Sequence, residues 1–347
     1  FHGRGVFEMN ANRVVRRRSL LAGAAAALGG LALGGPAWAQ QKVDALVLGG
    51  PYASVSNPLI RMVQSDALAD VAGHLEFAEW KDPDQLRALA LGGKADFLAM
   101  PSNVAANLYN RGVPLKLLDI NTWGILSIVS RDEGMKTLAD LAGKELVMPF
   151  RGDMPDIIFQ TLAAQQGIKV GEDVKLRYVA TPMDAMQLLL TRRADQALLA
   201  EPAISMAFIK SRSLPVKVIA PELYRSVDLQ AEWGRVFDRP ARIPQAGIVV
   251  LGRRMDDAEL IARFERAHAQ ALQWCGAHAD ACGRIVAERI PMLTPEGVAD
   301  SIHAVQAEYV SAADARPELE FFYQKLAERE PGLFGGNAPA VVLYYGA

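Results

Sequence analysis

The stretch ELVMPFRGDMPDIIFQTLAAQQGIKVGEDVKLRYV, residues 145–179, has the order of a strand, a helix and a second strand. Its first segment, Glu145–Pro149, is short and apolar, Pro155–Gln166 has the length and composition of a helix, and Lys175–Val179 again favours a strand. Two parallel strands need a crossover connection, which is usually a helix. This stretch therefore predicts an α/β fold built from βαβ units.

The same alternation extends from residue 145 in both directions. On the N-terminal side we expect strands at Val43–Leu48, Leu75–Trp80, Phe97–Met100, Leu115–Ile120 and Ile125–Ser130. Helices are expected between them at Pro58–Leu68, 82–92 and Pro101–Asn110. On the C-terminal side we expect helices at Pro182–Arg192 and Pro202–Lys210 and strands at Gln196–Leu199 and Val216–Ile219. Mainly helical sequence follows from Asp256, with a helix start at Thr294-Pro295-Glu296. This pattern predicts mostly parallel sheets flanked by helices.

Two extended, β-rich stretches are candidates for crossovers between two lobes. They are Thr122–Arg131 and Ile243–Gly252. If the chain leaves the first lobe at the former and returns at the latter, lobe 1 is discontinuous, with residues 41–130 and 244–347, and lobe 2 is 131–243. The pattern alone leaves a single domain open as an alternative.

Residues 13–39 have the sequence of an export signal. Arg16, Arg17 and Arg18 precede an apolar stretch rich in Ala, Gly and Leu, and Ala37-Trp38-Ala39 supplies a small-residue cleavage pattern near Ala39. The paired arginines fit a twin-arginine signal. We interpret residues 1–8 as upstream read-through. The alternative, a membrane anchor, is disfavoured because the apolar stretch is shorter than the ~20 residues of a spanning helix. This signal predicts a periplasmic protein.

The composition narrows the class of partner. Apolar residues make up 51% of the chain, and about 307 residues follow the leader, enough for two domains. The leader takes away five arginines and one glutamate, which leaves 32 basic and 38 acidic residues and a net charge of −6. A mildly acidic chain without basic clusters does not favour nucleic-acid binding. We expect a monomer.

The chain has two cysteines, Cys275 and Cys282. On one unbroken helix their Cα atoms would lie ~10 Å apart, beyond the reach of a disulfide. A helix break at Gly276-Ala277-His278 would let them approach, and export favours oxidation. Both the disulfide and the free thiols therefore remain open. Zinc coordination with His268 and His278 is disfavoured because the spacing fits no usual zinc pattern.

No motif for catalysis is present. The sequence lacks GxSxG, HExxH and a phosphate-binding loop, and its histidines are scattered. We therefore expect no enzyme activity, no cofactor and no metal.

Polar and aromatic residues instead cluster in the turns between the end of a predicted strand and the start of the next helix. In open α/β sheets these turns lie at the carboxyl edge, where ligands bind. Each residue taken singly is also explained as a cap or a turn residue. Their joint placement predicts a ligand pocket lined by Tyr52, Ser54, Ser102, Asn103, Trp123, Arg151, Asp153, Met154, Glu201 and Gln245.

Three segments carry a resemblance to a known family. They are residues 93–108, with Gly-Lys-Ala-Asp followed by Met-Pro-Ser-Asn, residues 138–149, and residues 194–202. In this order, and with the tail 334–346, they resemble the soluble binding proteins of bacterial ABC importers in the nitrate/sulfonate/taurine and thiamine-pyrimidine (NitT/TauT-like) group. The resemblance implies the type II fold, with two α/β lobes, two crossovers and a ligand at the hinge.

The resemblance also implies a function. A receptor of this family closes its lobes on a small molecule and delivers it to an ABC-type permease. Where family members often have a Gly-Ser/Thr-rich turn, this chain has Phe150-Arg151-Gly152-Asp153-Met154, which disfavours nitrate, sulfonate and bicarbonate and favours an organic ligand. The alternatives are an exported enzyme or a sensory receptor on the same scaffold.

Overall fold

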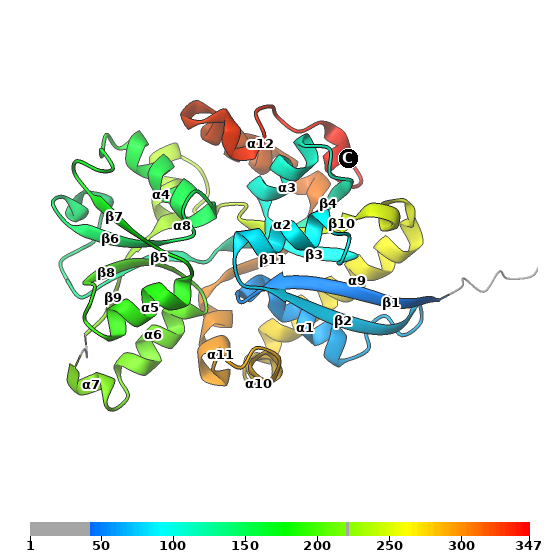
Figure 1. Ribbon diagram of the computed structural model, residues 1–347, viewed down its shortest axis with the longest axis horizontal. Coiled ribbons are helices and arrows are strands. Elements are labelled where there is room, and N and C mark those ends of the chain that lie inside the picture. The colour runs from blue at the N-terminus through cyan, green and yellow to red at the C-terminus, as the bar shows by residue number, and fades with distance from the viewer. Residues whose placement is uncertain (1–41, 220–221) are drawn as a thin grey trace, which may run out of the picture. The chain divides into compact units, whose positions relative to one another are not determined.

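A computed structural model describes residues 42–219 and 222–347 of this chain, and residues 42–347 form one compact unit. The predicted leader, the segment 1–8 and the Ala220-Pro221 step lie outside the described residues. Two separate β-sheets, A and B, organise the unit, and helices flank both of them (Figure 1). The predicted α/β class is confirmed.

Sheet A has six strands in the order β11-β4-β10-β3-β1-β2. Strands β1 and β2 pair in parallel, as do β1 and β3, whereas β10 and β11 run antiparallel to their neighbours. The strands cover Val43–Pro51 (β1), Ala72–Trp80 (β2), Phe97–Pro101 (β3), Leu115–Gly124 (β4), Ala246–Leu251 (β10) and Gln306–Ser311 (β11).

Sheet B has five strands in the order β7-β6-β8-β5-β9. Strand β6 is parallel to β7 and β8, and β5 is antiparallel to β8 and β9. The strands cover Leu126–Ser130 (β5), Glu145–Pro149 (β6), Lys175–Val179 (β7), Gln196–Ala200 (β8) and Tyr224–Asp228 (β9). The βαβ unit of residues 145–179 is thus present with the strands that its sequence predicts.

The sheets are mixed rather than mostly parallel. The βαβ units supply the parallel pairs. Each sheet also contains a strand that the chain forms directly after crossing from the other sheet, namely β10 in sheet A and β5 in sheet B. Such a strand enters from the opposite end and therefore pairs in the antiparallel sense. The chain passes from sheet A to sheet B at Ile125, between β4 and β5, and returns before β10.

Helices lie on both sides of the two sheets. In sheet B, Figure 1 shows α4 and α8 on one side and α5 and α6 on the other. The helices cover Asn57–Gln64 (α1), Pro83–Leu91 (α2), Ser102–Asn110 (α3), Met154–Gln165 (α4), Pro182–Leu190 (α5), Ala203–Ser211 (α6), Val216–Ile219 (α7), Leu229–Phe237 (α8), Ala258–Ala277 (α9), Ala279–Arg289 (α10), Pro295–Ala304 (α11) and Ala312–Arg329 (α12).

Each sheet separates two apolar cores. In β6, Leu146 and Met148 pack on one side, while Val147 packs on the other. This is the two-residue period of a strand buried on both faces. The aromatic rings of Phe97 in β3 and Phe264 in α9 stack at 3.8 Å in the second core. Burial on both faces explains why these strands read as continuous apolar runs.

Three sequence predictions differ from the structure. Residues 216–219, expected as a strand, form helix α7, and strands β9 and β11 were not expected. Val218 of α7 is 77% exposed, so this β-branched segment has no sheet face to pack on. Strand β11 is an edge strand with largely polar, partly exposed residues. β-Propensity depends on such context, and polar edge strands carry little apolar alternation.

The cysteines lie on either side of the predicted helix break. Helix α9 ends at Ala277 and α10 begins at Ala279, so the break falls at His278. Both cysteines are buried free thiols. A hydrogen bond with the Cys282 thiol, followed by burial, raises the pKa of Cys275. The two side chains are thus in hydrogen-bond contact.

A close approach of backbone in sheet A makes Gly247 sensitive to substitution. A Cβ at this position would lie 1.8 Å from the Asp119 carbonyl oxygen, in the middle of the sheet. We expect Gly247→Ala to destabilise the fold by about 1–3 kcal/mol or more, measured by denaturant unfolding. Gly276→Ala in α9, where a Cβ meets nothing within 4 Å, is the control and should be neutral or stabilising. Equal stability of Gly247→Ala and the parent would contradict this packing.

Candidate functional site

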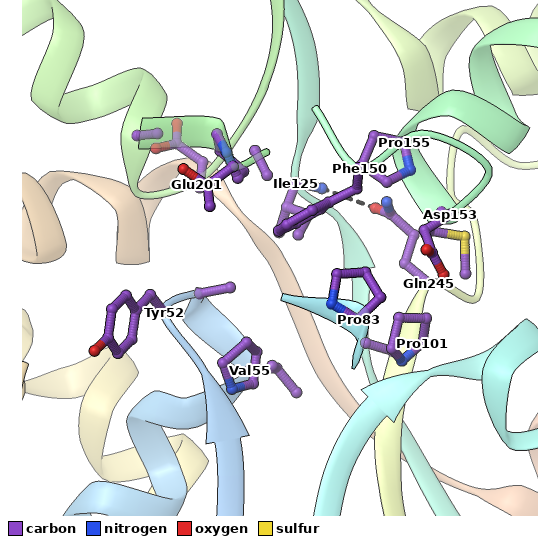
Figure 2. A pocket seen from close by; sticks show the side chains of 18 of the residues that line it. Tyr52, Val55, Pro83, Pro101, Ile125, Phe150, Asp153, Pro155, Glu201 and Gln245 are labelled. Atoms are coloured by element: carbon purple, nitrogen blue, oxygen red, sulfur yellow. Dashed lines mark hydrogen bonds between the residues drawn. The ribbon is translucent and has the colours of Figure 1, made fainter. Parts of the chain in front are cut away.

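A pocket of about 300 Å³ lies between the facing ends of the two sheets (Figure 2). From sheet A it is lined by the ends of β1, β2 and β3 and by the turns that follow them. From sheet B it is lined by the turns after β6, β7 and β8. The carboxyl edges of the parallel strands of both sheets thus meet at one place, as expected for a ligand site in α/β sheets.

Most of the pocket wall is apolar. Proline and methionine contribute much of it, namely Pro51, Pro83, Pro101, Pro155, Pro182, Met100, Met154, Met183 and Met292. Several of these prolines occupy the first turn of a helix, where a preset φ suits them. Since proline has no N–H group, each one also removes a hydrogen-bond donor from the helix end that faces the pocket.

Asp153 and Arg87 form an ion pair across the pocket. Asp153 is the N-cap of α4 beside sheet B, and Arg87 lies in α2 beside sheet A. Arg87 Nη2 donates to Asp153 Oδ1 at 3.1 Å. Burial raises the pKa of the Asp153 carboxyl, and the nearby Arg87 opposes this shift. The pair therefore links α2 beside sheet A to α4 beside sheet B, with the carboxylate buried and the guanidinium partly exposed.

Glu201 lies on the sheet B side, directly after β8. Its side chain is only 2% exposed and accepts from the Ser205 backbone N–H at 3.0 Å and from the Arg225 guanidinium. Both carboxylate oxygens therefore have donors from within sheet B and its helices. This buried carboxylate is satisfied by the protein itself.

Gln245 ties the two chain passages together. Its side-chain carbonyl accepts from Ile125 N at 2.9 Å, and its backbone N–H donates to Thr122 O at 3.0 Å. Figure 2 shows the first of these bonds at the wall of the pocket. The residues at which the chain changes sheets thus also form part of the ligand site.

Tyr52 lines the pocket after β1. Its hydroxyl donates to Glu79 Oε1 at 3.0 Å, and Lys81 Nζ lies 5.8 Å from the ring centroid. Burial, followed by the hydrogen bond to Glu79, raises the pKa of Tyr52. The phenol is therefore neutral at physiological pH and presents an aromatic face.

Phe150 was missed by the sequence reasoning. It follows β6 and adopts φ of 55°, in the left-handed region that a bulky residue rarely occupies. Its carbonyl accepts from Asp153 N at 2.9 Å, which closes the turn before α4. Figure 2 shows the side chain directed into the pocket. Sequence gives no sign of a strained φ at a phenylalanine, although its position after a strand was a usable clue.

Five of the ten predicted site residues line the pocket, namely Tyr52, Asp153, Met154, Glu201 and Gln245. The other five do not. Ser54 is buried in the turn before α1, the Ser102 hydroxyl donates to Pro244 O at 2.6 Å, and Asn103 donates to Leu333 O at 3.5 Å.

Trp123 and Arg151 also point elsewhere. The Trp123 indole donates to Glu308 O at 2.9 Å, and its ring packs under Arg242 at 4.2 Å. The Arg151 guanidinium lies 4.9 Å from the Tyr178 ring centroid. A residue that follows a strand can point to either side of the sheet edge, so the position alone did not separate pocket residues from caps.

Within residues 42–219 and 222–347, no group of three or more His, Cys, Asp and Glu residues is arranged to hold a metal ion. Across the same ranges, no helix combines the length and the hydropathy needed to cross a bilayer.

The comparisons with known proteins agree with the sequence resemblance. Residues 74–233 match the NMT1/THI5-like family. No curated protein sequence matches the chain. Solved structures do match, and an ABC transporter protein from Parabacteroides distasonis aligns with a TM-score of 0.68 and 21% identity, over 88% of this chain and 99% of its own.

Two further neighbours have named ligands. The periplasmic nitrate-binding protein NrtA from Synechocystis PCC 6803 aligns with a TM-score of 0.64 and 16% identity, over 83% of this chain and 82% of its own. The aliphatic sulphonate-binding protein SsuA from Escherichia coli gives 0.62 and 15%, over 86% and 93%. These likenesses establish the two-lobe fold of periplasmic binding proteins for this chain.

The ion pair across the pocket gives a pH-dependent prediction. Arg87→Ala should leave Asp153 buried without its cation and cost about 1 kcal/mol of stability at pH 7, since Arg87 is partly exposed. The cost should shrink as pH falls through the raised pKa of Asp153, because a protonated carboxyl needs no cation. Unfolding midpoints measured between pH 7 and pH 3 test this.

The matched control is Asp84→Ala. Asp84 contacts the same Arg87 at 3.6 Å, but its side chain is fully exposed. We expect no measurable loss from this variant at either pH. If Arg87→Ala cost the same at both ends of the pH range, the pairing with Asp153 would not explain the loss.

Proposed function

We propose that this chain, which carries an NMT1/THI5-like domain over residues 74–233, is a solute-binding receptor that captures a small organic molecule and delivers it to an ABC-type permease. The observation that carries the proposal is the pocket between the carboxyl edges of two sheets, with walls from both. The importer-related structural neighbours support it.

We propose that the lobes move about the two chain passages between the sheets, which Gln245 joins by hydrogen bonds. We keep residues 41–130 with 244–347 as lobe 1 and 131–243 as lobe 2, with the sheet change at Ile125 close to the first boundary. A ligand that contacts both walls is bound better when they are close together, so it shifts the population toward the closed form. The Arg87–Asp153 pair joins the two proposed lobes in the structure, and we propose that opening the lobes breaks it.

Export to the periplasm completes the proposal. A twin-arginine signal cleaved near Ala39 would release the mature receptor outside the inner membrane, where its permease is accessible. The receptor acts as a monomer, without nucleic acid or a cofactor. The acidic composition after cleavage and the lack of catalytic motifs support these assignments.

Two other functions use the same scaffold. An exported enzyme would need an activated nucleophile or a general acid and base in the pocket, and both buried carboxylates there are engaged by arginines. A sensory receptor would bind the same ligand and pass the signal to a membrane partner. Transport is favoured by the importer components among the structural neighbours.

A thermal-shift screen of the mature protein tests the function. We expect at least one compound among nitrogen, sulfur and vitamin-precursor compounds to raise the unfolding temperature, because a ligand bound only by the folded state adds stability. At a free concentration of 100 times Kd the gain is about 2.7 kcal/mol. The bound compound should be recovered unchanged, and deletion of the gene should abolish its uptake.

Two results would contradict the proposed transport function, and each points to a different alternative. Chemical conversion of the compound by the purified protein would identify an enzyme. Unchanged uptake after deletion, together with tight binding, would instead favour a sensory role.

A further inference from the structure

The helix ends that face the pocket are unusually acidic. A helix N-terminus carries free N–H groups and a partial positive charge, and it binds oxyanions readily. Helices α2, α3, α4, α5 and α6 all begin at the pocket. Their first turns should therefore decide whether an anion can be held there.

Four of these five ends carry a protein carboxylate, and the exception is the start of α3, whose first turn has no acidic residue. Asp82 caps α2 by accepting from Gln85 N, and Asp184 completes a reciprocal cap with Thr181 at α5. Asp153 is the N-cap residue of α4, although its carboxylate accepts from Arg87 and from no N–H group of the helix, and Glu201 accepts from Ser205 N in α6. These carboxylates offset the positive ends of α2, α4, α5 and α6, so those four ends attract a negatively charged ligand only weakly.

The basic groups nearby are engaged as well. Arg87 pairs with Asp153 at 3.1 Å and Arg225 pairs with Glu201. Lys81 lies over the Tyr52 ring at the rim. Burial raises the pKa of Asp153 even with Arg87 beside it, which indicates a weakly hydrated, low-dielectric surrounding. Transfer of an unpaired charge of either sign into such a site is unfavourable.

The apolar wall supplies the remaining recognition. Phe150 is held in the left-handed region at φ 55°, and strained backbone of this kind persists where the surroundings enforce it, often at ligand sites. Its ring reaches into the pocket, among the prolines and methionines that line it (Figure 2). An aromatic ring there offers a face for stacking.

We propose that the pocket selects an uncharged, apolar organic molecule that packs on the Phe150 ring, and that it rejects oxyanions. This inference rests on the proposed receptor function and narrows its ligand. An anion is disfavoured because carboxylates stand at four of the five helix starts at the pocket and both arginines beside it are paired, while Lys81 at the rim and the start of α3 keep a positive charge. A cation is disfavoured because both buried carboxylates already have arginine partners.

Three probes of nearly equal shape test the charge preference. Benzyl alcohol, benzylammonium and phenylmethanesulfonate share one ring and differ in charge. We expect benzyl alcohol at millimolar concentration to raise the unfolding temperature of the mature protein, with at least tenfold weaker binding of the two ions by calorimetry. Tighter binding of the sulfonate, or of the ammonium ion, would overturn the proposal.

Variants at positive φ separate binding from folding. Phe150→Gly relieves the left-handed strain but removes the ring, so benzyl alcohol should bind about fivefold to tenfold more weakly while the unfolding temperature changes little. Asp66→Gly, at φ 49° in an exposed turn, is the matched control and should leave binding unchanged. Equal binding by Phe150→Gly and the parent would remove Phe150 from the site.

The outcome also separates this inference from the receptor function. If all three ring probes fail while a polar compound from the wider screen binds reversibly and unchanged, the proposed ligand class is wrong and the receptor function stands. If the purified protein converts a bound compound, the receptor function itself is wrong.

Discussion

The pairing of two chain passages is the constraint on which the rest of the structure depends. Near Gln245 the returning chain runs beside the outgoing one, and Ile243 N donates to Trp123 O at 2.8 Å. The Gln230 side chain accepts from Leu126 N and donates to Leu126 O, which fixes the start of β5. These bonds place the ends of the strands of one sheet opposite those of the other, so that the turns after their parallel strands face one another.

That arrangement determines the chemistry of the pocket. Facing carboxyl edges bring several helix N-termini to one place, and an uncompensated set of these would form an anion site. In this chain Asp82 caps α2, Glu201 accepts from Ser205 N in α6, and the Asp153 carboxylate lies at the start of α4, where it pairs with Arg87. The fold is shared with nitrate- and sulphonate-binding proteins, whereas we infer the ligand class from the charges at the helix starts of this chain. Fold and ligand class are thus separable here.

Much of the fold could be predicted from the sequence because strands buried on both faces read as short apolar runs between helices. The βαβ unit of residues 145–179 is the clearest case. The polar edge strand β11 could not be found this way, because edge strands lack a buried face. Of the ten residues proposed for the site, five line the pocket and five do not. Tyr52, which follows β1, and Gln245, on the return passage before β10, lie at the pocket wall, whereas side-chain direction, as at Trp123, depends on tertiary packing.

Native mass spectrometry of the mature protein purified from bacterial periplasm tests the central claim most directly. The account predicts one small organic molecule per chain, released on denaturation with its mass unchanged and carrying no phosphate, sulfonate or nitrate group. The mass of a reaction product that accumulates with time, or a ligand that remains after the pocket is filled by a bulky substitution at Met183, would contradict it.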